Sequence, residues 1–88
     1  MFEPTTNEAE AIALAALAAT LSDEQRAARF LELTGLSPNG LRARIGERGL
    51  LAATLAFLEA HEPDLVAVAE AIGRPPAALV AARAELEA

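Results

Sequence analysis

The sequence predicts an all-α protein, a compact six-helix bundle built from two tandem three-helix repeats at about residues 12–45 and 50–83. Alanine and leucine, which both favour helices, dominate a composition that is 53% hydrophobic. Cap residues, glycines and prolines divide the chain at short intervals. No segment alternates polar and apolar residues long enough to predict a strand. Because the chain has only 88 residues, we expect a single helical domain over residues 1–88.

Capping signals mark the individual helices. Thr5-Thr6-Asn7-Glu8 places a cap residue three positions before a glutamate, which is the spacing of a capping box, at the start of the first helix. Ser22-Asp23-Glu24-Gln25 repeats that spacing before the second helix, and Gly35 is placed to end it in the left-handed conformation. Ser37 and Pro38 suit the cap and the first position of a short third helix. The expected helices are about 6–21, 23–34, 38–45, 50–60, 63–72 and 76–86.

The repeat is visible when the chain is compared with itself at a shift of 38 residues. The matched positions are Glu32 and Glu70, Gly35 and Gly73, Pro38 and Pro76, Leu41 and Leu79, and Ala43 and Ala81. The glycine and proline matches are the informative ones, because these residues fix where one helix ends and the next begins. A period of this size is typical of a repeated supersecondary unit.

The first and fourth helices are expected at the centre of the bundle. Neither 11–19 nor 50–58 contains a charged residue, and a helix that is apolar on every side is usually buried. We expect these two helices to pack against each other, with the other four around them. The expected core residues are Leu14, Leu17, Leu21, Phe30, Leu51, Leu55, Phe57 and Leu58. If solvent instead reaches one side of the first helix, the same pattern indicates a dimer seam, so the expected state is a monomer or a homodimer.

The composition disfavours an enzyme. Cysteine, lysine and tyrosine are absent, His61 is the only histidine, and Ser22 and Ser37 are both explained as helix caps. Glu59, Glu62 and Asp64 lie near a helix start, where the helix dipole favours acids without any metal. We therefore expect no catalytic residues, no cofactor and no metal. The longest apolar run, 11–21, is short of the roughly 20 residues that a membrane helix needs. We expect a cytoplasmic protein with no membrane partner.

The charge distribution suggests where a partner binds. The net charge is −6, but residues 26–48 carry five arginines between two acidic segments. Val68–Leu79 resembles a helix-turn-helix, with Ala69 four residues before the turn glycine and Leu79 six after it, and the same outline surrounds Gly35. The helix after the second copy offers Arg83 alone. The third helix has the candidate partner or nucleic-acid patch, formed by Asn39, Arg42, Arg44 and the nearby Arg48.

These features favour a non-catalytic protein-interaction or regulatory adaptor whose protein partner the sequence does not identify. The alternative is a DNA-binding helix-turn-helix regulator that uses the third helix. A net charge of −6 disfavours that alternative, because nucleic acid repels an acidic protein.

The chain resembles a family of small bacterial helical proteins, domain of unknown function 3572. The residues that carry the resemblance are 13–17, 29–38, 51–58 and 81–83, and the segment Phe30-Leu31-Glu32-Leu33-Thr34-Gly35-Leu36 is the most specific of them. The resemblance covers most of the chain. It implies a small soluble helical protein without an assigned activity, and it brings no catalytic residues with it.

Overall fold

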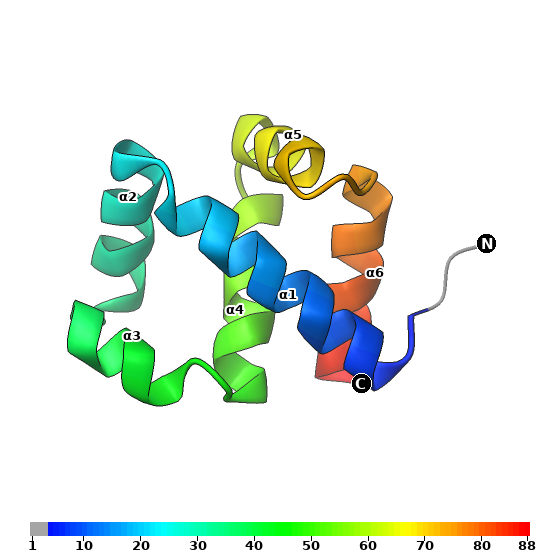
Figure 1. Ribbon diagram of the computed structural model, residues 1–88, viewed down its shortest axis with the longest axis horizontal. Helices are drawn as coiled ribbons and strands as arrows, with labels where there is room; N and C mark the ends of the chain where they lie inside the picture. The colour runs from blue at the N-terminus through cyan, green and yellow to red at the C-terminus, as the bar shows by residue number, and fades with distance from the viewer. Residues whose placement is uncertain (1–3) are drawn as a thin grey trace.

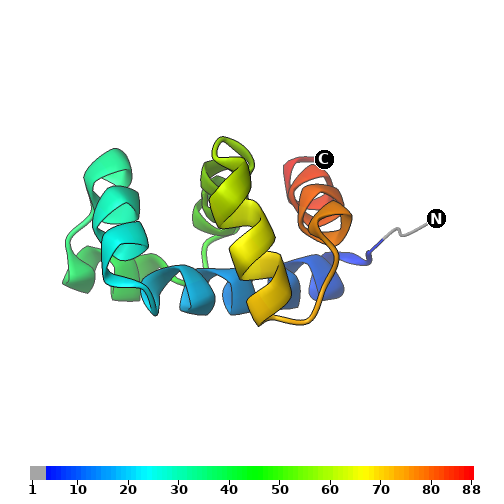
Figure 2. The same ribbon diagram turned by 90° about the horizontal axis from the view of Figure 1, so that it is seen from above.

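Six α-helices make up nearly all of the described chain, residues 4–88 of a computed structural model (Figure 1). They are α1 (Thr6–Leu21), α2 (Glu24–Thr34), α3 (Pro38–Arg44), α4 (Arg48–Glu59), α5 (Glu62–Ala71) and α6 (Pro76–Glu87). No strand occurs within residues 4–88. The all-α prediction is confirmed. Figure 2 shows α1 running along one side of the molecule, from which α2, α5 and α6 project.

The main core lies between α1, α4 and α6, which pack most extensively against one another. Small buried residues on α1 and α6 let these helices approach closely. Leucines fill the space between them. The small residues are Ala9, Ala13, Ala16, Ala78 and Ala82, and the leucines are Leu17, Leu51, Leu55, Leu58 and Leu79. The pairing of α1 with α4 agrees with the sequence prediction, and α6 is a third helix of this core that the sequence did not indicate.

The outer face of α1 departs from the prediction. Leu14 is 41% exposed, so its expected place in the core is wrong, and Leu21 is only partly buried. Alanines 11, 15 and 18 are exposed beside Leu14. The physical reason is that α1 lies at the edge of the bundle, so only one of its faces meets other helices. The rest of the predicted core is confirmed as buried: Leu17, Phe30, Leu51, Leu55, Phe57 and Leu58.

The capping predictions are right at two helices and wrong at one. Thr5 and Glu8 form the expected capping box of α1, and the Ser37 hydroxyl accepts a hydrogen bond from the Gly40 N–H at the start of α3. The cap of α2 is Asp23, whose carboxylate accepts from the Arg26 N–H at 2.9 Å. Ser22 instead follows the last residue of α1, and its hydroxyl donates to the Ala19 carbonyl. Because Ser22 keeps helical backbone angles as the C-cap of α1, Asp23 is the first residue with extended backbone.

The two halves share their boundaries but not their packing. Gly35 and Gly73 both take the left-handed conformation, with φ of 72° and 71°. Pro38 and Pro76 both lie in the first turn of their helices. In the second half, α6 packs on α4 and α5, whereas in the first half α3 stands away from α1 (Figure 1). The second half is therefore closed and the first half is open. The helix expected from Leu50 begins earlier, at Arg48, because the chain turns before Glu47 and not at Gly49.

Candidate helix-binding groove

The open first half leaves a groove beside α4. We call α2 and α3 together the arm (residues 24–44). The arm packs mainly on α1 through α2, and between it and α4 lies a hollow of about 480 Å³, the α4 groove. Its lining is mostly apolar: Leu33, Thr34, Leu36, Arg44, Gly49, Leu50, Ala53, Ala56, Phe57 and Ala60.

The floor of the α4 groove is a row of small residues. Gly49, Ala53, Ala56 and Ala60 recur every three or four positions, so they lie on one face of α4, and all four are exposed. The buried side chains of Leu50 and Phe57 flank the row. No side chain in this row is longer than a methyl group. A second helix can therefore approach the α4 backbone closely along this face.

The wall of the α4 groove is formed by the arm. Leu33 of α2 is 72% exposed, which makes it the most exposed large apolar residue among those described. A second hollow of about 480 Å³ lies beside it, lined by Arg29, Glu32, Leu33 and Phe57. Leu33 and Phe57 line both hollows, so the groove continues past Leu33 along the arm.

Two contacts hold the arm in place at its α5 end, and the first is aromatic. Phe30 is completely buried and is the only buried residue of α2. Its ring meets the Phe57 ring edge to face, with centroids 5.2 Å apart and an interplanar angle of 77°. Aromatic pairs favour this geometry because the edge of one ring is positive and the face of the other is negative. The pair fixes α2 against α4 at the floor of the groove.

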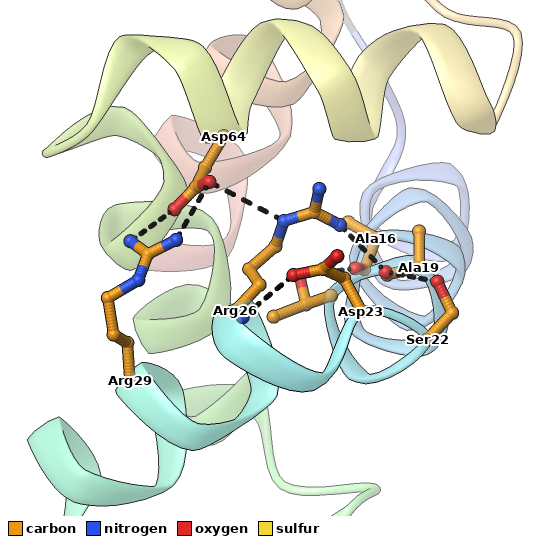
Figure 3. Close-up of polar contacts among 8 residues, drawn as sticks. Ala16, Ala19, Ser22, Asp23, Arg26, Arg29 and Asp64 are labelled. Carbon is orange, nitrogen blue, oxygen red and sulfur yellow. Dashed lines mark hydrogen bonds and ion pairs between the residues drawn. The ribbon is translucent and has the colours of Figure 1, made fainter.

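The second contact is an ion cluster centred on Asp64 of α5 (Figure 3). Asp64 is only 6% exposed. It accepts two hydrogen bonds from Arg29, at 2.7 Å from Nη1 and 3.1 Å from Nη2. Nε of Arg26 lies 3.5 Å from the same carboxylate, and Nη1 of Arg26 donates to the Ala19 carbonyl at the end of α1. The cluster thus joins α1, α2 and α5.

The cluster lowers the pKa of Asp64. The hydrogen bonds from Arg29 are the main cause, and the positive charges of Arg29, His61 and Arg26 act in the same direction. Burial of the carboxyl acts to raise the pKa, but its effect is smaller than the lowering by these groups. The same pairing raises the pKa of Arg29. The two charges are therefore held together at neutral pH, and α2 stays against α5.

The sequence did not indicate this role of Asp64. The predicted interaction with the helix dipole agrees with its position near the start of α5, but it does not include the arginines. The additional signal is the pair of arginines, Arg26 and Arg29, three residues apart on one face of α2. Only the fold brings that face to α5, so spacing alone could not identify the partner.

The four predicted patch residues are all exposed, and their polar side chains have different partners. Arg42 donates to the Asn39 side chain at 2.7 Å, which keeps these two together on α3. Arg44 pairs with Glu47 at 2.9 Å and lines the α4 groove. Arg48 reaches to the other side of α4, where Nη2 donates to the Glu85 carbonyl of α6 at 3.4 Å.

The acids around His61 also have separate partners. Glu59 pairs with Arg83 of α6, and Asp64 pairs with Arg29. His61 is exposed and precedes α5 without making a side-chain cap. Within residues 4–88, no three acids or histidines are grouped to hold a metal ion.

No single helix of the described chain is both long and apolar enough to cross a membrane. Only α5 and α6 taken together reach that length and hydropathy, and they meet at 100°.

The fold and the groove define a small all-α protein with an open apolar face. The chain belongs to the family described as "Protein of unknown function (DUF3572)", whose model matches residues 6–88. The resemblance noted in the sequence is therefore confirmed. No curated protein and no solved structure matches the chain.

Proposed function

We propose that this protein is a non-catalytic adaptor that binds a helix of a partner protein in the α4 groove. The observation that carries the proposal is the combination of a flat floor of small residues with the 72% exposed Leu33 on the wall. Helix-in-groove binding places the apolar face of an incoming helix against such a surface. Covering one exposed leucine contributes about 1.5–3 kcal/mol, so Leu33 is expected to contribute more to binding than any alanine of the floor.

We also propose that the halves at 12–45 and 50–83 are a tandem repeat, each helix-turn-helix-like in outline. The protein is proposed to be bacterial and cytoplasmic. The helix boundaries that recur 38 residues apart support the repeat. The helix-turn-helix outline then serves to pack short helices and not to bind DNA. The open first half, 12–45, forms the wall of the binding groove.

DNA binding through α3 is the second candidate. Arg42 and Arg44 on α3 favour it, because guanidinium groups contact phosphates well. It predicts that a labelled duplex binds at low salt and is released steeply as salt rises. Arg42→Ala combined with Arg44→Ala would then abolish the shift. If no duplex binds at low ionic strength, this candidate is rejected and the adaptor proposal is unaffected.

Site-specific photo-crosslinking tests the adaptor proposal. A diazirine analogue of leucine is placed at Leu33 in the full chain, in cells that make this protein natively. The matched control carries the same analogue at Leu14, an exposed leucine on α1 outside the groove. We expect a discrete protein adduct at Leu33 and none at Leu14.

The captured protein is then purified and titrated against the intact chain. Ala53→Arg places a long charged side chain on the groove floor and should abolish binding. Ala15→Arg, an exposed alanine on α1, should leave it unchanged. Equal adducts at both leucines, or unaltered binding by Ala53→Arg, would reject the proposal.

A further inference from the structure

We infer that the occupant of the α4 groove is an alanine- and leucine-rich helix that lies antiparallel to α4 and carries acidic residues in its last turn, next to Arg44. This inference rests on the proposed adaptor function and names the chemistry of the partner.

The molecule already contains such an arrangement on the other side of α4. There α6 runs in the opposite direction to α4 and packs closely on it (Figure 1). The last turn of α6 lies at the start of α4, where Arg48 donates to the backbone carbonyl of Glu85 at 3.4 Å. The carboxylates of this turn have other partners, because Glu85 accepts from Thr6 and Glu87 pairs with Arg83. The side chains that α6 buries are Ala78, Leu79, Ala82 and Leu86. The groove lies on the opposite flank of the same helix, with Arg44 at the corresponding end.

Charge sets the direction of the occupant. Glu47 precedes α4 and makes no side-chain cap, so the first N–H groups of α4 keep their positive partial charge. Arg44 lines the groove at this end. The last turn of a helix is negative, and carboxylates there strengthen the attraction. An antiparallel occupant places that turn beside Arg44, whereas a parallel one places its positive start there.

Arg44 is able to exchange partners. Its pair with Glu47 is half exposed on both sides, with side-chain exposures of 52% and 54%. Exposed ion pairs contribute little to stability, so a carboxylate of the occupant competes with Glu47 at small cost. Arg29 at the other end of the arm differs, because the buried Asp64 already holds it.

The groove also sets the size of the side chains it receives. The floor of Gly49, Ala53 and Ala56 leaves room for leucine side chains spaced three or four residues apart. On the wall, Leu33 projects into the space and requires small residues opposite it. An alanine- and leucine-rich face satisfies both surfaces.

The probe for this inference is a fluorescein-labelled peptide with the sequence of residues 76–87. A hydrocarbon staple replaces Val80 and Ala84, which are both exposed in α6, to hold the peptide helical. Fluorescence anisotropy follows its binding to the intact chain. We expect Ala53→Arg to weaken binding by about tenfold or more and Ala15→Arg to change it by less than about twofold. Circular dichroism confirms that both variants stay folded.

Charge and direction are tested with one further variant of the protein and two further peptides. Arg44→Glu should weaken binding by about fivefold, and a peptide with Glu85→Arg and Glu87→Arg should recover that loss on the Arg44→Glu variant. A peptide with the two glutamates moved from its last turn to its first should bind more weakly than the original. The difference should shrink at high salt, which screens exposed charges.

The outcomes separate this inference from the proposed function. If the stapled peptide does not bind, or if Ala53→Arg and Ala15→Arg affect it equally because it merely displaces α6, the inference is overturned. The crosslink at Leu33 would then still support the adaptor function. If the peptide binds but Arg44→Glu has no effect, the predicted direction and acidic end are wrong. Loss of both the crosslink and the peptide binding would reject both proposals.

Discussion

Asp64 is the residue on which the position of the arm depends most. It is a nearly buried carboxylate that receives two hydrogen bonds from Arg29 and the charge of Arg26. Removing one member of such a cluster leaves the remaining charges buried and unpaired. The loss of stability is then larger than the stability that the pair contributed. The same side chain would be an unremarkable helix-start acid if α2 packed elsewhere.

Asp64→Asn should lower the free energy of unfolding by about 1–3 kcal/mol at pH 7, because the amide accepts fewer charged hydrogen bonds. The native state lowers the pKa of Asp64, so its contribution is fully present above the unfolded value of about 3.9 and is lost as pH falls through the lower native value. The variant and the original chain should therefore converge in acid. Urea unfolding between pH 7 and pH 3 measures this, and a difference that is constant with pH would contradict it.

Helix boundaries were largely predictable from the sequence because they depend on local chemistry. The Thr5 capping box, the left-handed Gly35 and Gly73, and the prolines at two helix starts act within a few residues of themselves. The error at Ser22 has the same local character. Two cap residues stand side by side there, and the length of α1 decides which one is used.

The packing of the helices was less predictable, because burying an alanine side chain changes the free energy only slightly. Alanine is therefore found both in cores and on surfaces. The absence of charge over 11–19 suggested that α1 is buried all round, but the alanines and Leu14 of its outer face reach solvent. The sequence also did not predict that α3 would stand away from α1. The turns before α3 and α6 match closely, yet α3 buries only Leu41, whereas α6 buries four side chains. The α4 groove results from that difference.

The arm should be the least stable element of the described chain. α2 buries only Phe30, and the seven-residue α3 buries only Leu41. Hydrogen exchange followed by mass spectrometry should show faster exchange in 24–44 than in α1, α4 and α6, because regions with few buried contacts open locally. Phe30→Ala should accelerate exchange in the arm far more than in α6. Uniform acceleration across all helices would show that the arm opens only with the whole molecule.

At the scale of the whole molecule, we expect a monomer. Solvent does reach one side of α1, which is the condition under which the sequence indicates a dimer seam. That side has a single bulky residue, Leu14, and its ends are acidic, with Glu8 and Glu10 at one end and Asp23 and Glu24 at the other. If two chains met through this face, their acidic ends would repel each other in a parallel or an antiparallel arrangement. A stable dimer also buries about 1,200–2,000 Å², far more than a short row of alanines provides.

Size-exclusion chromatography with light scattering measures the mass directly, and the expected value is the 9.1 kDa of one chain. Leu14→Glu should leave the elution volume unchanged. A mass near twice that value, reduced by Leu14→Glu, would establish the α1 face as a self-association surface.

The way in which the arm is attached has a consequence for recognition. Both anchoring contacts, Phe30 with Phe57 and Arg29 with Asp64, lie at one end of the arm, and α3 at the far end is held by one leucine. We therefore expect the anchored end of the groove to be its rigid end and the end at Arg44 to be compliant. If a partner helix binds there as proposed, the rigid end would require a close fit from its first turns, while the compliant end would accept different last turns provided that they are acidic. Discrimination between partners would therefore be concentrated at the rigid end, and the range of accepted partners would be set at the other.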